Sequence, residues 1–372
     1  MSWNKKKLET IIQFKNGKKR PNSSGTIPVY GGNGILGYTN ESNYKDCIIV
    51  GRVGAYCGSV YYEPFECWIS DNAIAGQPKN DTDISYAYYL LSSLQLNRRH
   101  IGTGQPLLTQ SILNGIDCLI PDIETQKKIS GFLGTIDQKI YLNEEVNKNL
   151  EEQAQSLYQS WFIDYEPFGG DRPSDWTDGT IDDLAKEIIC GKTPSTKVPE
   201  YYGSDIPFIT IPDMHGNTYA VTTDRYLSAY GAESQRKKML PRNSICVSCI
   251  GTAGLVTLTA QESQTNQQIN SIIPKEGYSP YYIYLLMQTL SVIINNLGQS
   301  GSTIVNLNKA QFGKIPVTIP SVATMKSFDE IAKPMFDAIL SNQEENIKLA
   351  ELRDSLLPRL MSGELDVSGI DL

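Results

Sequence analysis

The chain has 372 residues, of which 40% are hydrophobic, and a formal net charge of −8, so it is long enough for two or more domains. It has no run of about 18 apolar residues and no apolar signal-peptide core behind its charged start, and we therefore expect a cytoplasmic protein without a membrane span. Seven cysteines without a compact framework and two histidines without a ligand pair argue against a disulfide scaffold and against metal-dependent hydrolysis.

The first 122 residues alternate short apolar strands with loops that contain glycine. Residues 17–32, "GKKRPNSSGTIPVYGG", give a Gly-Lys turn, a polar loop and an Ile-Pro-led strand. Apolar strands interrupted by glycine follow at 47–62. An apolar, helical segment at 85–100 then leads to the polar loop "GTGQP" at 102–106. This pattern predicts a mixed α/β domain over residues 1–122.

Residues 123–171 carry the clearest periodicity in the chain. Apolar residues with the 3-and-4 spacing of a coiled-coil seam are Ile129, Leu133, Ile136, Ile140, Leu150, Ala154, Leu157 and Trp161. The spacing predicts one long helix. About 38 residues of helix span about 57 Å, which is more than a domain of this size needs for its own core. We therefore expect the helix to separate two domains.

Residues 172–320 repeat the plan of residues 1–122 in the same order. A second Gly-Lys opening is found in "CGKTPS", residues 190–195, and a polar loop in "GQSGST", residues 298–303. A constant shift of 199 residues relates the two copies from Pro121 and Pro320 onward. The second helix, in residues 321–372, has its seam at Phe328, Ala332, Met335, Ile339, Leu349, Leu356 and Leu360. The chain is therefore predicted to be an internal duplication.

Polar residues interrupt both seams at matching points. They are Asn143 and Asn147 in the first helix and Asn342 and Asn346 in the second. A buried asparagine in such a seam fixes one register, provided that its amide finds a partner. We expect an antiparallel pair of helices with these residues in one polar layer, although solvent-exposed helix faces would give the same sequence. The predicted α+β fold has two globular mixed α/β domains, separated by long antiparallel coiled-coil helices with pseudo-two-fold symmetry.

Two short motifs invite a catalytic interpretation. "CGKTPS" ends like a phosphate-binding P-loop, but Lys186 stands where the first glycine of G-x-x-x-x-G-K-[ST] is needed. Its counterpart at Gly17 has Lys19 in place of Ser or Thr, so a P-loop nucleotide hydrolase is a poor alternative. Cys246 and Cys249 lie in an apolar strand, where residues three apart point to opposite faces, and they do not predict a zinc or redox site.

The negative charge is concentrated in the predicted helices. The net charge is +2 for residues 1–122 and 0 for 172–320, but −5 for each of 123–171 and 321–372. Basic clusters in the globular parts are Lys15, Lys18, Lys19 and Arg20; Arg98 and Arg99; and Arg236, Lys237 and Lys238. A near-neutral domain gains little affinity for DNA from counterion release. A basic partner should then supply much of the phosphate contact.

With the duplication in view, the chain resembles the specificity (S) subunit of Type I restriction-modification systems. The resemblance rests on the Gly-Lys openings, the loops "GTGQP" and "GQSGST", and the passage "CLIPDIETQKKISGFLGTIDQKI" from the first domain into its helix. It also rests on the closing "LLPRLMSGEL" and covers nearly the whole chain. The second passage, "VTIPSVATMKSFDEIA", lacks the Glu-Gln that is usual there. The resemblance implies target-recognition domains at 1–122 and 172–320 and conserved-region helices at 123–171 and 321–372.

The resemblance also implies a non-catalytic role in a larger complex. Two methylation (M) subunits would dock on the helices and methylate adenine N6 in a bipartite target on double-stranded DNA. Restriction (R) subunits would cleave unmodified DNA. S-adenosylmethionine, ATP and Mg would be bound by these partners, because this chain has neither an [NDS]-P-P-[FYW] segment nor a helix-opening G-x-G-x-x-G. A duplicated protein- or carbohydrate-binding module without a DNA role is the alternative.

Base readout requires side chains that pair with base edges, and loops are the natural place for them. The candidates in the first domain are Lys18, Lys19, Arg20, Arg52, Thr103 and Gln105. The candidates in the second domain are Lys192, Thr193, Asn266, Gln267, Gln299, Ser300 and Ser302. The stretch Asn266 to Gln268 could read adenine, or its amides could only satisfy a turn.

Overall fold

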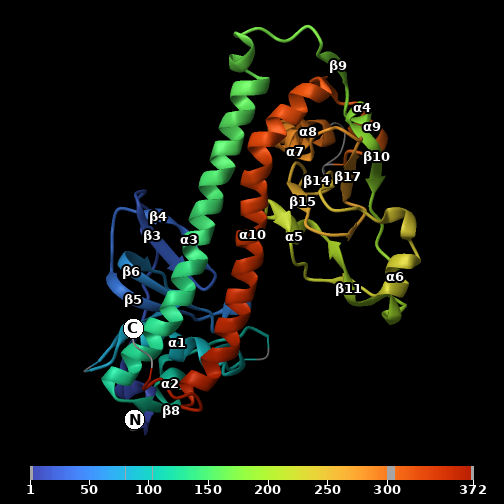
Figure 1. Ribbon diagram of the computed structural model, residues 1–372. Coiled ribbons are helices and arrows are strands. Elements are labelled where there is room, and N and C mark those ends of the chain that lie inside the picture. The colour runs from blue at the N-terminus through green and yellow to red at the C-terminus, as the bar shows by residue number, and fades with distance from the viewer. Residues whose placement is uncertain (1–2, 80, 103, 300–305, 370–372) are drawn as a thin grey trace. The chain divides into compact units, whose positions relative to one another are not determined.

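The computed structural model describes residues 3–79, 81–102, 104–299 and 306–369 (Figure 1). The chain forms two compact units: residues 1–140 with 348–372, called unit 1, and residues 141–347, called unit 2. Two 40-residue helices, α3 (Ile123–Phe162) and α10 (Val322–Met361), each contribute to both units. The long helices expected from the seam periodicity are thus confirmed.

Unit 1 is built on a six-stranded sheet in the order β2-β7-β5-β6-β3-β4. Its strands are β2 (Ile12–Asn16), β3 (Ile27–Gly31), β4 (Gly34–Thr39), β5 (Tyr44–Gly51), β6 (Val60–Ile69) and β7 (Ala73–Pro78). All neighbouring strands are antiparallel except β3 and β6, which are parallel. A separate ladder joins β1 (Trp3–Lys7) to β8 (Asp117–Pro121). Helices α1 (Ile84–Ser93) and α2 (Gln110–Asn114) complete the unit.

The sheet of unit 1 is buried on both faces. Along β5, Ile48 and Val50 belong to one apolar cluster, whereas Cys47 and Ile49 belong to another, as the two-residue period of a strand requires. The larger cluster includes Ile129 and Leu133 of α3 together with Leu360 and Met361 of α10. The last turns of α10 are therefore part of the apolar core on one face of the six-stranded sheet.

Unit 2 repeats this plan with a sheet in the order β10-β17-β14-β15-β12. These strands are β10 (Ala185–Cys190), β12 (Tyr219–Ala220), β14 (Ile245–Ser248), β15 (Val256–Thr259) and β17 (Ile269–Pro274). A second sheet joins β13 (Tyr226–Leu227), β11 (Tyr202–Ile209) and β16 (Gln264–Thr265). The ladder of β9 (Thr177–Thr180) with β18 (Pro316–Ile319) is the counterpart of β1 with β8. Short helices are α4 (Ile181–Leu184), α5 (Ile211–Met214), α6 (Ala229–Glu233) and α9 (Lys309–Gly313).

The apolar segments that follow the strands form shorter helices than their sequences predict. In unit 2 the segment divides into α7 (Pro280–Thr289) and α8 (Ser291–Gln299). The hydroxyl of Ser291, at the junction, donates a hydrogen bond to the carbonyl of Gly254. In unit 1, α1 ends at Ser93, and Gln95 adopts a left-handed conformation before a single 3-10 turn. In both units the equivalent tyrosines, Tyr86 and Tyr282, donate to the ladder strands β8 and β18.

Within unit 2, α3 and α10 pack antiparallel through the asparagines singled out above. Asn143 Nδ2 donates to Asn346 Oδ1 at 2.8 Å and to Glu345 Oε2 at 2.7 Å. Asn342 Nδ2 donates to Asn147 Oδ1 at 2.8 Å. Asn143 and Asn147 are 4% and 8% exposed. The four amides therefore lie together in a largely buried layer, and their role in fixing the helix register remains a prediction.

Candidate nucleic-acid interface

The repeated Gly-Lys dipeptides occupy equivalent turns in the two units. In unit 1 the N–H of Gly17 donates to Ala73 O and that of Lys18 to Ile69 O, both at 3.0 Å. A Cβ on Gly17 would collide with the backbone carbonyl of Ser70, so only glycine fits there. The turn is therefore held against the loop between β6 and β7.

In unit 2 the second Gly-Lys dipeptide makes the corresponding contacts. The N–H of Gly191 donates to Ile269 O at 3.1 Å and that of Lys192 to Thr265 O at 2.9 Å. A Cβ on Gly191 would collide with the carbonyl of Asn266. Residues 191–198 form no helix, whereas a P-loop places a helix directly after its Gly-Lys-Thr. "CGKTPS" is therefore a close-packed turn and not a P-loop.

Further backbone hydrogen bonds connect two more loops of unit 1 to the loop between β6 and β7. Arg52 N donates to Asn72 O at 3.0 Å, and Leu108 N donates to Arg52 O at 2.8 Å. Leu107 N donates to Ile101 O at 2.9 Å. We call the resulting set the loop cluster of unit 1, which consists of residues 17–20, 51–56, 70–72, 101–102 and 104–107.

Unit 2 has the same connections at equivalent positions. Cys249 N donates to Gln268 O at 2.8 Å, and Leu307 N donates to Cys249 O at 2.9 Å. Asn306 N donates to Gly298 O at 2.9 Å. The loop cluster of unit 2 consists of residues 191–194, 249–254, 266–268, 298–299 and 306–307. The two clusters share a backbone plan and differ in their side chains.

The predicted readout residues of unit 1 belong to its loop cluster. Lys18, Lys19 and Arg20 are exposed in the first loop, and Gln105 is exposed in the last. Arg52 is half-buried between these loops, and its Nε has no hydrogen-bond partner among the described residues although it is buried. Thr103 lies outside the described residues.

Five of the predicted readout residues of unit 2 lie in the described part of its loop cluster. Lys192 is exposed, and Thr193 Oγ1 donates to Gln267 Oε1 at 2.7 Å. Asn266 is 8% exposed, because its amide closes the turn through both the side chain and the N–H of Gln268. The exposed amide of this loop is therefore that of Gln267. Gln299 ends α8, and Ser300 and Ser302 lie outside the described residues.

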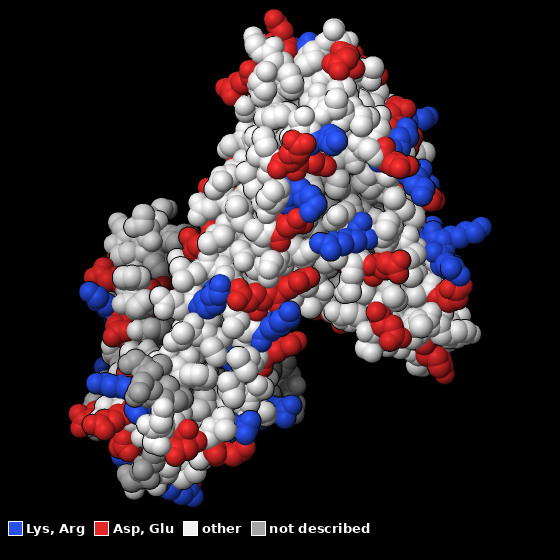
Figure 2. Space-filling model, in the orientation of Figure 1, with Lys and Arg blue, Asp and Glu red and all other residues white. Residues whose placement is uncertain are grey.

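Charge alone does not mark the loop clusters. On the face shown in Figure 2, Lys and Arg side chains lie among Asp and Glu side chains, and neither sign forms a continuous patch. Within unit 1, Asp71 is exposed in the same cluster as Lys18 and Arg20. A surface of this kind binds DNA weakly on its own, so specificity would have to come from base contacts.

The cysteines and carboxylates do not form a reactive centre in the described part of the chain. Cys246 and Cys249 belong to different apolar clusters on opposite faces of the sheet, as predicted. Burial raises the pKa of both thiols to about 12. The described residues contain no group of three or more His, Cys, Asp or Glu side chains that could hold a metal ion. They also contain no helix long and apolar enough to cross a membrane.

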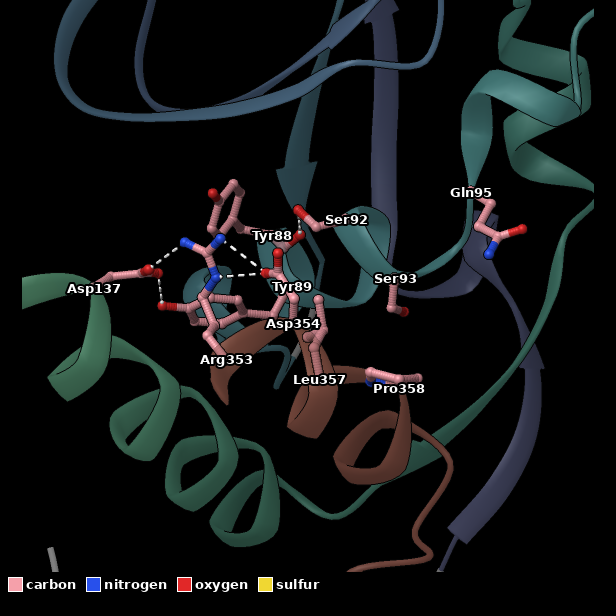
Figure 3. Close-up of a pocket in the computed structure, with 10 residues that line it drawn as sticks. All are labelled: Tyr88, Tyr89, Ser92, Ser93, Gln95, Asp137, Arg353, Asp354, Leu357 and Pro358. Carbon is pink, nitrogen blue, oxygen red and sulfur yellow. Dashed lines mark hydrogen bonds and ion pairs between the residues drawn. The ribbon is translucent and has the colours of Figure 1, made fainter. Parts of the chain in front are cut away.

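A pocket in unit 1 contains a cluster of polar side chains from both long helices (Figure 3). Arg353 of α10 forms ion pairs of 2.8 Å with Asp137 of α3 and with Asp354. Tyr89 of α1 donates to the other Asp137 oxygen at 2.5 Å. Burial, together with this hydrogen bond, raises the pKa of Tyr89 well above its usual value. These groups satisfy one another, so the pocket is an ion-pair network that fastens α10 to the first domain.

Two features of the loop clusters were not anticipated from the sequence. Asn72 of unit 1 occupies the position of Gln268, and the fixed spacing of 196 residues between these turns could have identified it. The β3–β4 hairpin also reaches the loop cluster of unit 1. Each unit thus carries one loop cluster on its own sheet, and the two clusters are built on the same backbone plan.

Comparisons with known proteins agree with this description. The family model for the Type I restriction modification DNA specificity domain matches residues 1–152 and 173–351. The Type I restriction enzyme HindI specificity subunit of Haemophilus influenzae is 35% identical, over 70% of this chain and 71% of that protein. The Type I restriction enzyme MjaIX specificity subunit of Methanocaldococcus jannaschii is 25% identical, over 78% of this chain and 71% of that protein.

A solved structure shows the same fold. The S subunit of the Type I restriction-modification system from M. genitalium superposes with a TM-score of 0.62, at 16% identity, over 97% of this chain and 96% of that chain. The chain therefore belongs to the Type I restriction-modification DNA specificity family. Its role is that of a DNA sequence-specificity subunit.

Proposed function

We propose that each unit reads one half of a bipartite DNA target through its loop cluster. The helices α3 and α10 then set the length of the unread gap between the half-sites. The observation that carries this proposal is the duplicated backbone plan with different side chains, in which Arg52 of one cluster corresponds to Cys249 of the other. A shared scaffold with exchanged side chains is what two independent base-reading surfaces need.

The same proposal assigns the chemistry to partner subunits. Two methylation subunits dock on this chain and transfer a methyl group to adenine N6, and restriction subunits act on unmodified DNA. S-adenosylmethionine, ATP and Mg are bound by those partners, and this chain has no catalytic role. The acidic charge of −5 on each of residues 123–171 and 321–372 supports basic docking surfaces on the partners.

Adenine methylation in the host tests this function. The full-length chain should co-purify with a methyltransferase, and sequencing of methylated adenines should give a split motif with two constant half-sites and one gap length. Exchange of residues 172–320 for the corresponding part of another family member should change only one half-site. A contiguous motif, or no motif that depends on this chain, would contradict the proposal and would favour a binding module without a DNA role.

A further inference from the structure

The β3–β4 hairpin is an unusual edge for a sheet. β4 is the last strand in the sheet order and, among the described residues, pairs only with β3, so no further strand continues the sheet beyond it. Three large apolar residues of this strand are nevertheless exposed: Ile35 by 49%, Leu36 by 39% and Tyr38 by 52%. Soluble proteins usually protect such an edge with charges or cover it, so an apolar edge strand indicates a ligand.

The hairpin is continuous with the loop cluster of unit 1. A Cβ on Gly32, at the hairpin turn, would lie 3.7 Å from the carbonyls of Val53 and Asn72 and from the Cβ of Tyr56. Tyr56 is itself 57% exposed. The hydroxyl of Ser59 also donates to Gly32 O. The exposed apolar side chains therefore adjoin the loops that carry the predicted readout residues.

Cationic side chains flank the hairpin. Arg20 Nη1 donates to the carbonyl of Leu36 at 3.2 Å, which lays the guanidinium on β4. Lys18 and Lys19 are exposed in the same loop as Arg20. An apolar strand beside three positive charges suits a ligand that presents phosphates around a partly apolar surface, and this favours nucleic acid over a strand from another protein.

Unit 2 has a different element at this place. β11 pairs in parallel with β16 as β3 pairs with β6, but the chain then enters α5 instead of a hairpin. Thr210 and Asp213 close the start of α5 with a capping box, and the exposed residues that follow, His215 and Asn217, are polar. The exposed side chains at this position are therefore apolar in unit 1 and polar in unit 2.

We propose that Ile35, Leu36 and Tyr38 contact thymine methyl groups in the half-site that unit 1 reads. This inference rests on the proposed function and names the specificity determinant of one recognition surface. A two-stranded β-ribbon fits the major groove of B-DNA, and the C5-methyl of thymine is the apolar group on the base edges there. The hairpin thus discriminates T·A from C·G pairs by burying a methyl group.

The test uses the full-length chain assembled with its methylation partners and a duplex that carries the methylated target. Each thymine in the half-sites is replaced singly by uracil, which removes only the methyl group. We expect at least one replacement in one half-site to weaken binding about fourfold per buried methyl. The variants Ile35→Ala, Leu36→Ala and Tyr38→Ala are measured on the same duplexes. In the variant that lacks the side chain in contact with the methyl group, replacing that thymine by uracil should no longer change the binding affinity.

Two controls match this experiment. Leu119→Ala shortens an exposed apolar side chain of the separate β1–β8 ladder, where Leu119 is 44% exposed, and it should keep the uracil effect. Uracil placed in the gap should change nothing. The effect of uracil on binding is first measured with the wild-type complex. The methyl contact can therefore be tested even if one of the variants fails to fold.

Several results would overturn the inference. Specific binding with no uracil effect, or with the same effect in wild type and all three variants, excludes methyl contact by the hairpin. Half-sites without any A·T pair exclude it as well. If the hairpin substitutions weaken subunit assembly and leave the uracil effect unchanged, the edge binds protein. A complex without any specific binding would instead refute the proposed function itself.

Discussion

The asparagine layer gives the sharpest test of how this chain fixes a spacing. Asn147→Leu removes the oxygen that accepts from Asn342 Nδ2 at 2.8 Å and leaves that amide without this acceptor in a packed helix pair. Removing one partner of such a pair costs about 1–3 kcal/mol in the free energy of unfolding. In the double variant Asn147→Leu with Asn342→Leu, both amides are replaced by apolar groups of similar size. Its stability should return to the wild-type value or exceed it.

Urea unfolding followed by circular dichroism measures the four members of this double-mutant cycle. A coupling energy of at least about 1–3 kcal/mol is expected, because the two side chains contact each other directly and the double variant should lose no stability. If asparagines hold the register, the double variant should also methylate targets with more than one gap length in the host. Additive single effects would refute the pairing. A stable double variant with one unchanged gap would refute the register role.

Three further predictions concern single side chains. Gly17→Ala forces a Cβ into a backbone carbonyl and should lower the free energy of unfolding by at least about 2 kcal/mol. The control Gly104→Ala, whose Cβ would meet nothing within 4 Å, should leave the urea midpoint unchanged. Equal midpoints for the two variants would refute the close-packed turn. Arg353→Met leaves Asp137 without its ion-pair partner and should lower the thermal midpoint of unit 1; an unchanged midpoint would show that the network is dispensable. Because burial raises the pKa of Cys246 from 9.0 to about 12, its contribution to stability is complete below pH 9 and is lost as the pH rises toward 12. Cys246→Ala should therefore show a shallower loss of stability over that interval, and an identical slope would refute the shift.

The sequence was most informative where its periodicity is long. The seam of α3 and α10 repeats over several heptads, and the asparagines break it at a constant shift, so the helices and the duplication could be read from spacing alone. The hydrogen bonds among the four amides followed from that register. The boundary between α7 and α8 at Leu290 could not be predicted from the local sequence. Ser291, directly after it, donates a hydrogen bond to Gly254, which lies 37 positions earlier in the chain.

The loop clusters could be predicted only in part. Their residues were chosen for side-chain chemistry, but the cluster of unit 1 forms because Arg52 bonds to Asn72 and Leu108, across 20 and 56 positions of chain. No local pattern encodes such pairings. The hairpin was missed because the alternation of apolar and polar residues is lost where Ile35 and Leu36 follow Gly34. An exposed apolar strand looks like a core strand until its neighbours are known.

Unit 1 draws its core from both ends of the chain, and this affects the order of folding during synthesis. Leu356, Leu360 and Val367 pack against the same cluster as Leu8 and Ile129. The residues of unit 2 are contiguous, so that unit can fold as soon as they have left the ribosome. Until residues 348–372 have been synthesised, the apolar side chains of the N-terminal part of unit 1 that they cover stay exposed. A chain terminated shortly after residue 347 would therefore leave unit 1, which is made first, unfinished and prone to aggregate, although unit 2 is complete.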